Sequence, residues 1–317
     1  NCTLEESSTA FSRINSKGTD ISKVAMLQAL TYRNKHSVLL ADEINDLINS
    51  LSIYGFQQMK PDDVLNCCYR YVGKKFYDSG ILDSIVKCDN LKEVLDTMRV
   101  DVTNAVKFLY EDCGVISFRL LPYTKQLYAI ASFFKEKQEP TSEELSELRK
   151  WFFYTTYRQL FMNSSLTNVR MLFNRFDSYL KGENEPAIDY EPITIDYRLD
   201  FNFKPEYALS DFIILCQINK RRTVDDIYTL SYSGEYTQYG KKPSFAIALL
   251  SSSDKAEIIK MTKGENSSLV PEMCFLSADI IDNMRMGKVE TFGRLRKKVL
   301  VEETKNFLRS LTITLTE

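Results

Sequence analysis

Apolar residues recur at intervals of three and four positions along most of residues 1–180, which is the spacing of one face of an α-helix. The segment 91–109 keeps this spacing throughout. Its apolar positions are Leu91, Val94, Leu95, Met98, Val102, Ala105, Val106 and Leu109. Gly114 lies just beyond, where glycine commonly ends a helix. The pattern therefore predicts a long helix with one buried face.

The same periodicity predicts further helices on both sides of this one. They are expected at residues 38–53, 61–72, 127–134, 141–161 and 164–180. Thr141 and Glu144 have the spacing of a capping box, in which each side chain bonds the backbone amide of the other residue. Gly182 follows the last of these helices. We therefore expect a mainly α fold with a multi-helix N-terminal region.

The pattern changes between Gly182 and Pro192, where acidic residues and prolines break the helical period. Apolar and polar residues then alternate from Ile193 to Phe203, as in a strand with one exposed face. Further on we expect a helix at 205–218, a hairpin or irregular loop at 227–239, a strand or buried helix at 245–250, a basic amphipathic helix at 293–311 and a closing strand at 311–315. These elements predict a smaller α+β C-terminal domain. By pattern the chain divides at residue 182, and the C-terminal domain is expected at 183–317.

The densest aromatic cluster runs from Trp151 to Phe161. Beside Arg149, Lys150 and Arg158, such rings can stack on nucleic-acid bases, as they do in single-strand binders. On a helix, however, neighbouring positions point in all directions, so most of these rings must pack between helices. Core packing is the interpretation that we favour.

The composition is that of a globular protein with room for a sizeable core, since 44% of the 317 residues are hydrophobic and 26% are charged. A formal charge of −2 leaves room for a basic face. The seven cysteines show no Cys-x-x-Cys spacing, so we expect reduced thiols in a cytoplasmic protein. No apolar run has the length of a membrane span, and no signal-peptide pattern opens the sequence.

Residues for catalysis are sparse in this sequence. His36 is the single histidine, so a catalytic triad, a Cys–His pair and a zinc site would all have to share it. A histidine in this context is more often a surface residue or a helix-capping residue. Neither Gly-x-x-x-x-Gly-Lys-Ser/Thr nor Gly-x-Gly-x-x-Gly occurs. Adjacent carboxylates occur at Asp42-Glu43, Asp62-Asp63, Glu143-Glu144 and Asp225-Asp226, mostly where helices are expected to begin. We identify no catalytic residue, no metal site and no cofactor from the sequence.

The segment from Phe11 to Leu30 predicts a helix, a tight corner at Gly18 and a second helix. Around this corner Arg13, Asn15 and Gly18 are followed by Ile21-Ser22, and this order resembles a motif of the GmrSD-type restriction endonucleases. Later blocks are similar to the helical region of the same family. They are Phe118-Arg-Leu-Leu-Pro-Tyr, Pro140-Thr-Ser-Glu-Glu-Leu and Arg149-Lys-Trp-Phe-Phe-Tyr.

The resemblance implies that residues 1–35 are the tail of a ParB-like nuclease domain, followed by a helical bundle at 36–182. Arg13 and Asn15 would then reach into the nuclease cleft or hold the corner by hydrogen bonds. The family's Asp-Gly-Gln-Gln-Arg loop is missing from this sequence, and residues 200–317 contain no histidine for a His-Asn-His-like unit. Because the sequence begins at Asn1 inside a helical pattern, we expect the gene product to extend upstream; an engineered or mature N-terminus is the alternative. The resemblance thus implies a bacterial phage-defence protein whose cutting machinery lies elsewhere.

Basic residues gather in the C-terminal part of the chain. Two small groups are Lys220-Arg221-Arg222 and Lys241-Lys242, and the largest comprises Arg285, Lys288, Arg294, Arg296, Lys297 and Lys298. At the start of a helix such side chains suit a phosphate, although Glu302 and Glu303 one turn later also fit an ordinary solvated face.

Two functions follow from these patterns. The chain is either the non-catalytic DNA-recognition or regulatory portion of a restriction-type endonuclease, or a protein-interaction or oligomerisation scaffold. The partners expected are DNA, an upstream nuclease domain or a twin subunit, and not a membrane. Salt-dependent DNA binding would distinguish the first function from the second.

Overall fold

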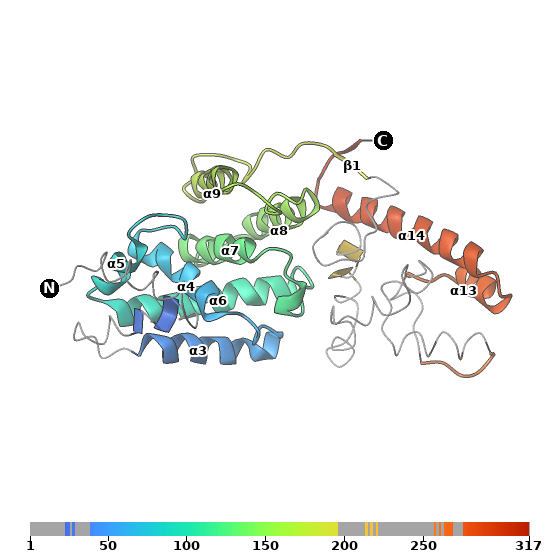
Figure 1. Cartoon of the computed structure of the whole chain (residues 1–317). Coiled ribbons are helices and arrows are strands. Elements are labelled where there is room, and N and C mark those ends of the chain that lie inside the picture. Colours follow the sequence, from blue (N-terminus) through green and yellow to red (C-terminus); the bar gives the residue numbers. More distant parts are fainter. Residues whose placement is uncertain are drawn as a thin grey trace. The chain divides into compact units, whose positions relative to one another are not determined.

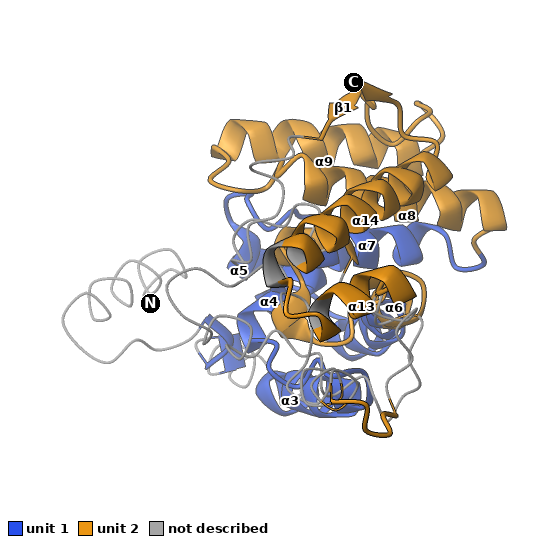
Figure 2. Ribbon diagram, turned by 90° about the vertical axis from the view of Figure 1, so that its right-hand side faces the viewer, with its two compact units in different colours: residues 1–106, 127–139 blue, residues 107–126, 140–317 orange. Residues whose placement is uncertain are grey.

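The computed structural model describes residues 23–25, 27–28, 39–195, 213–214, 216–217, 220, 257, 260, 263–268 and 275–316. These residues are mainly helical, so the predicted mainly α class is confirmed (Figure 1). The chain forms two compact units (Figure 2). Unit 1 comprises residues 1–106 and 127–139, and unit 2 comprises residues 107–126 and 140–317.

The helices of the first half follow the predicted order. They are α3 (Leu40–Ser50), η1 (Leu51–Tyr54), α4 (Pro61–Cys68), η2 (Tyr69–Val72), α5 (Ile81–Val86), α6 (Leu91–Glu111), η3 (Phe118–Leu120) and α7 (Thr124–Glu136). After them come α8 (Ser142–Tyr157), α9 (Leu166–Leu180), β1 (Ile193–Thr194), α13 (Ala278–Arg285), α14 (Val289–Ser310) and β2 (Leu315–Thr316). The short α5 helix was not predicted from the sequence.

The apolar face of α6 is the one that the periodicity predicts. Each of its eight predicted apolar residues is buried, with Val94 the most exposed at 9%. Residues 1–30 are described only in part, yet Val24 and Leu27 are helical and buried, as expected for the second helix after Gly18. The apolar spacing thus identifies the core positions of these helices.

Charged residues join α3 to α6 within unit 1. Glu43, in the first turn of α3, accepts from Lys92 at 2.7 Å and from Arg99 at 3.0 Å. These two cations lower the pKa of Glu43, with the hydrogen bond from Lys92 as the largest cause. Asp42 and Glu43 therefore place negative charge at the start of α3, where it complements the helix dipole, and Glu43 also forms an ion pair with α6.

A buried carboxylate in unit 1 gives a pH-dependent prediction. Asp101 is 3% exposed and accepts a hydrogen bond from the Tyr71 hydroxyl. Burial raises the pKa of Asp101, whereas that hydrogen bond lowers it. The net effect is a raised pKa, so the folded state binds the proton of the Asp101 carboxyl more tightly than the unfolded chain does. The stability that this proton contributes is therefore full at acid pH, and it is lost as pH rises through the folded pKa. In urea titrations from pH 3.5 to 7, Asp101→Asn should therefore gain stability relative to the natural chain as pH rises. A difference that does not change with pH would contradict this prediction.

The aromatic cluster of α8 forms the core of unit 2, which confirms core packing over base stacking for these rings. Trp151, Phe152 and Phe153 are each at most 1% exposed. The Trp151 ring lies 4.6 Å from that of Phe176 on α9, and the Phe153 ring lies 4.7 Å from that of Phe307 on α14. Aromatic pairs at these distances add to the free energy gained by burying the rings.

The start of α8 has the predicted capping box. The Glu144 amide donates to Thr141 Oγ1 at 3.2 Å, and the Thr141 amide donates to Glu144 Oε2 at 2.9 Å. These two bonds satisfy amides that have no partner inside the helix.

The packing does not divide the chain at residue 182, where the sequence pattern changes. Residues after that point pack on α8 within unit 2: the Ala187 amide donates to Glu147 at 2.8 Å, and Lys150 donates to Thr312 Oγ1 at 3.0 Å. The division into 1–35, 36–182 and 183–317 stays a prediction, and the two compact units have other bounds.

The described strands are short. β1 and β2 pair in parallel, with Ile193 opposite Leu315. The closing strand begins later than the expected residue 311, because the Leu311 amide still bonds the carbonyls of α14. Helix α14 begins at Val289, four positions before the expected start at residue 293. The expected strand beyond residue 195 and the segments 227–239 and 245–250 lie outside the described residues.

Candidate nucleic-acid interface

The predicted basic cluster lies at the corner between α13 and α14, two helices that pack on each other in unit 2 (Figure 1). Arg285 ends α13, Gly287 turns the chain at φ 71°, and Lys288 is the N-cap residue of α14. The Lys288 side chain makes no capping hydrogen bond, and it is exposed. The corner therefore places two cations at the start of a helix of 22 residues.

Arg294 and Lys298 continue this basic surface along α14. They are four positions apart, so they lie on one face of the helix, and both are exposed. Neither side chain is paired with another residue in the part of the chain that the structure describes. Their charges are therefore available to a ligand.

Two further cations on this face were missed in the sequence. Lys305 and Arg309 follow Arg294 and Lys298 after eleven residues each, which is about three helical turns. Arg309 is exposed, and Lys305 pairs with Glu302 at 2.9 Å. The recurrence of basic residues at this spacing was the signal that could have identified them. We call Arg294, Lys298, Lys305 and Arg309, together with Lys288 at the start of the helix, the α14 basic face.

The remaining members of the predicted cluster differ in their accessibility. Arg285 is about half exposed and pairs with Asp282 at 3.0 Å. Lys297 is half-buried. Arg296 is fully buried, on the side of α14 that also carries Phe292 and Leu300. Its guanidinium does not reach the surface, so we leave Arg296 out of the α14 basic face.

The second basic group is described only at Lys220. Its ammonium donates to the carbonyl of Asp112 at 2.9 Å, just beyond the end of α6, where a cation complements the helix dipole. Arg221 and Arg222 lie outside the described residues, as do Arg13, Asn15 and Gly18 of the motif corner and His36. Their predicted roles stay predictions.

The carboxylate pairs in the described ranges stand at helix starts. Asp42-Glu43, Asp62-Asp63 and Glu143-Glu144 occupy the first turns of α3, α4 and α8. Among the described residues, no group of three or more His, Cys, Asp or Glu side chains is arranged to hold a metal ion. The pairs therefore have a structural reason for their positions.

Four of the five described cysteines are unsuited to nucleophilic chemistry. Cys67, Cys68, Cys113 and Cys216 are free and buried. Burial raises the pKa of Cys68 to about 12 and raises the pKa of the other three thiols as well. A thiol with so high a pKa is not a thiolate at neutral pH.

No family model, no curated protein and no solved structure matches this chain. In the part of the chain that the structure describes, no helix is both long and apolar enough to cross a membrane.

Proposed function

We propose that this chain binds nucleic acid through the α14 basic face, as the non-cleaving DNA-recognition or regulatory portion of a restriction-type endonuclease. The proposal rests on two exposed side chains of α14, Arg294 and Lys298, that are unpaired among the described residues. A third exposed cation, Lys288, stands at the N-cap of the same helix. Phosphates bind to such combinations of cations and helix-start amides. The resemblance to GmrSD-type proteins adds the class of the parent protein.

The geometry favours contact with the backbone over base reading. The rise of an α-helix places Lys288 and Arg309 about 30 Å apart along α14. Between Lys298 and Lys305, Glu302 interrupts the row of cations. Phosphate contacts of this kind position a protein but carry no sequence information directly. We therefore expect weak binding with little sequence preference from this surface alone.

The test is a fluorescence-anisotropy titration of a labelled duplex at several salt concentrations. Replacing Arg294 and Lys298 together by glutamine should lower the slope of log K against log salt by about 1.8, because each phosphate contact contributes about 0.9. A matched double variant, Lys87→Gln with Lys181→Gln, removes two exposed cations that are not on α14. Its slope should stay that of the natural chain.

Three results would contradict the proposal. They are absence of DNA binding at low salt, equal slopes for the two double variants, and cleavage of DNA by this chain with Mg²⁺. The first would favour the alternative function of a protein-interaction scaffold, for which the oligomeric state in solution is the next measurement.

A further inference from the structure

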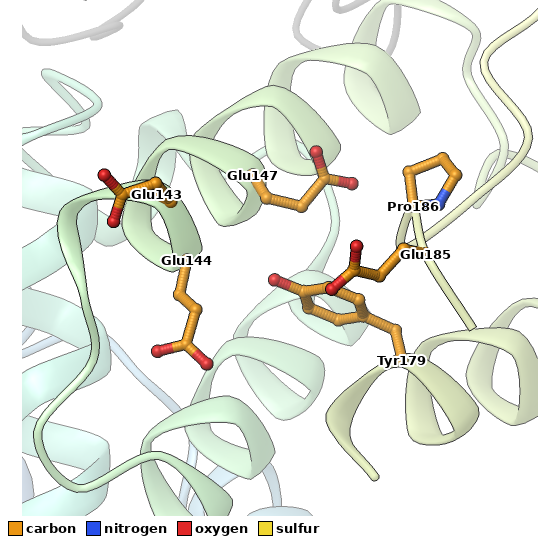
Figure 3. A pocket seen from close by; sticks show the side chains of 6 residues that line it. All are labelled: Glu143, Glu144, Glu147, Tyr179, Glu185 and Pro186. Atoms are coloured by element: carbon orange, nitrogen blue, oxygen red, sulfur yellow. The ribbon is translucent and has the colours of Figure 1, made fainter. Parts of the chain in front are cut away.

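A hollow of about 370 Å³ lies in unit 2. It is lined by acidic residues from α8 and the loop after α9, whereas the α14 basic face is positively charged. Its lining residues are Glu143, Glu144, Glu147, Tyr179, Glu185 and Pro186 (Figure 3). Three of the carboxylates come from the first turns of α8, Tyr179 comes from the last turn of α9, and Glu185 comes from the loop after α9. No cation is among the described residues that line it. The volume is that of a pocket for a small ligand.

The wall of this hollow is held in place by hydrogen bonds. Glu147 accepts from the Ala187 amide at 2.8 Å and from the Tyr190 hydroxyl at 2.6 Å, and so ties the loop after α9 to α8. The Glu191 amide donates to the Tyr154 hydroxyl at 2.9 Å further along the same loop. A ligand would therefore meet a shape that is already formed, which reduces the entropy lost on binding.

Tyr179 is the feature that the fold alone does not explain. The residue is 9% exposed, and its ring contacts that of Phe176 with the centroids 6.1 Å apart. Figure 3 shows its hydroxyl pointing away from α9 into the hollow, toward α8. Among the described residues, no group shares a hydrogen bond with this hydroxyl. The hydroxyl opens onto the hollow, so a ligand that donates a hydrogen bond can contact it there.

The chemistry of the lining selects the kind of ligand. Four carboxylates line the hollow and favour a positive charge, although the Lys150 ammonium over the Tyr190 ring offsets part of the charge of Glu147. Burial, with the charges of Glu147, Glu144 and Glu185, raises the pKa of Tyr179 to about 12, so its hydroxyl stays neutral. A neutral hydroxyl oxygen accepts hydrogen bonds from N–H groups, which quaternary ammonium ions lack. A metal ion is disfavoured, because these carboxylates are not grouped to hold one.

We propose that this hollow binds a primary ammonium or guanidinium group, which donates to the Tyr179 hydroxyl and is neutralised by Glu185 and the α8 carboxylates. Either a free polyamine or a lysine or arginine side chain of a partner polypeptide carries this chemistry. None of its described lining residues belongs to the α14 basic face, and its test contains no nucleic acid.

The test is isothermal titration calorimetry of the full chain with four probes at low salt. The probes are spermidine, the capped tripeptides Gly-Lys-Gly and Gly-Arg-Gly, and tetramethylammonium, which has the charge but no N–H donor. At least one N–H cation should bind at least tenfold more tightly than tetramethylammonium. Tighter binding of spermidine identifies a polyamine site, and tighter binding of a tripeptide identifies a site for a partner's side chain.

Two variants test the geometry, and a third is the matched control. Tyr179→Phe and Glu185→Gln should each weaken the binding about threefold to tenfold, since each removes one polar partner. Glu183→Gln removes an exposed carboxylate of the same loop that does not line the hollow, and it should leave the affinity unchanged. Tyr179→Phe keeps the ring, so its thermal midpoint should equal that of the natural chain.

The proposal would be overturned by no binding of any N–H cation, by equal binding of tetramethylammonium, or by an unchanged affinity in Tyr179→Phe. It would also be overturned if Glu183→Gln weakened binding as much as Glu185→Gln, because binding would then follow total charge and not the lining of the hollow.

Discussion

Replacing Trp151 by alanine is expected to lower the free energy of unfolding of unit 2 by about 3 to 5 kcal/mol. The side chain is 1% exposed, and its ring lies 4.6 Å from that of Phe176 and 6.1 Å from that of Phe161. Truncation removes the buried ring area and leaves a cavity that helices α8 and α9 cannot close without moving. This is the largest effect that we expect from a single substitution.

The measurement is urea unfolding followed by far-ultraviolet circular dichroism, because Trp151 is the only tryptophan and its fluorescence is lost in the variant. Met171→Ala is the control within the same unit. Met171 lies on α9 with 62% exposure, so its truncation should change the free energy by no more than about 0.5 kcal/mol. Similar losses in the two variants would contradict a core centred on the α8 aromatic rings.

The helices were predictable because their signals are local. In α6 the apolar residues at three- and four-residue intervals are the buried ones, and at α8 the residues Thr141 and Glu144 make both bonds of the capping box. The position of the aromatic rings between helices followed from their number on one helix, since rings that point in all directions cannot all face solvent. Periodicity and capping need no knowledge of which helices become neighbours.

Arg296 shows where a local pattern fails. It stands in a run of basic residues, which indicated a surface, yet it lies four positions from both Phe292 and Leu300 and is buried with them. The apolar residues on that side were the stronger signal, because the side of the helix determines burial and the neighbours along the sequence do not.

The hollow around Tyr179 was not predictable for a different reason. Glu143 and Glu144 are conventional first-turn residues of a helix, and nothing in the sequence brings them to Tyr179 or Glu185. Their proximity depends on how α9 and the following loop pack on α8, which is a property of tertiary structure alone. The same holds for the division of the chain into units, because residues after 182 pack on α8 in spite of the change in composition there.

Gly114 is the second position at which a single substitution should have a large effect, with a loss of about 2 to 5 kcal/mol for Gly114→Ala. Two causes act together. The residue has φ 74°, which side chains with a Cβ adopt only at a cost, and a Cβ atom there would lie 2.3 Å from the backbone carbonyl oxygen of Cys216. A backbone atom cannot rotate away as a side chain can, so the helical segment that contains Cys216 would have to shift.

Gly182→Ala separates the two causes. Gly182 also has φ 74°, but a Cβ atom there would have no atom within 4 Å, so only the backbone cost of about 1 to 2 kcal/mol remains. Urea unfolding of both variants should therefore give a clearly larger loss for Gly114→Ala than for Gly182→Ala. Equal losses would mean that the end of α6 does not approach Cys216 closely in solution. The hydrogen bond from the Lys220 ammonium to the Asp112 carbonyl lies beside the same contact, so we would then expect it to be absent as well.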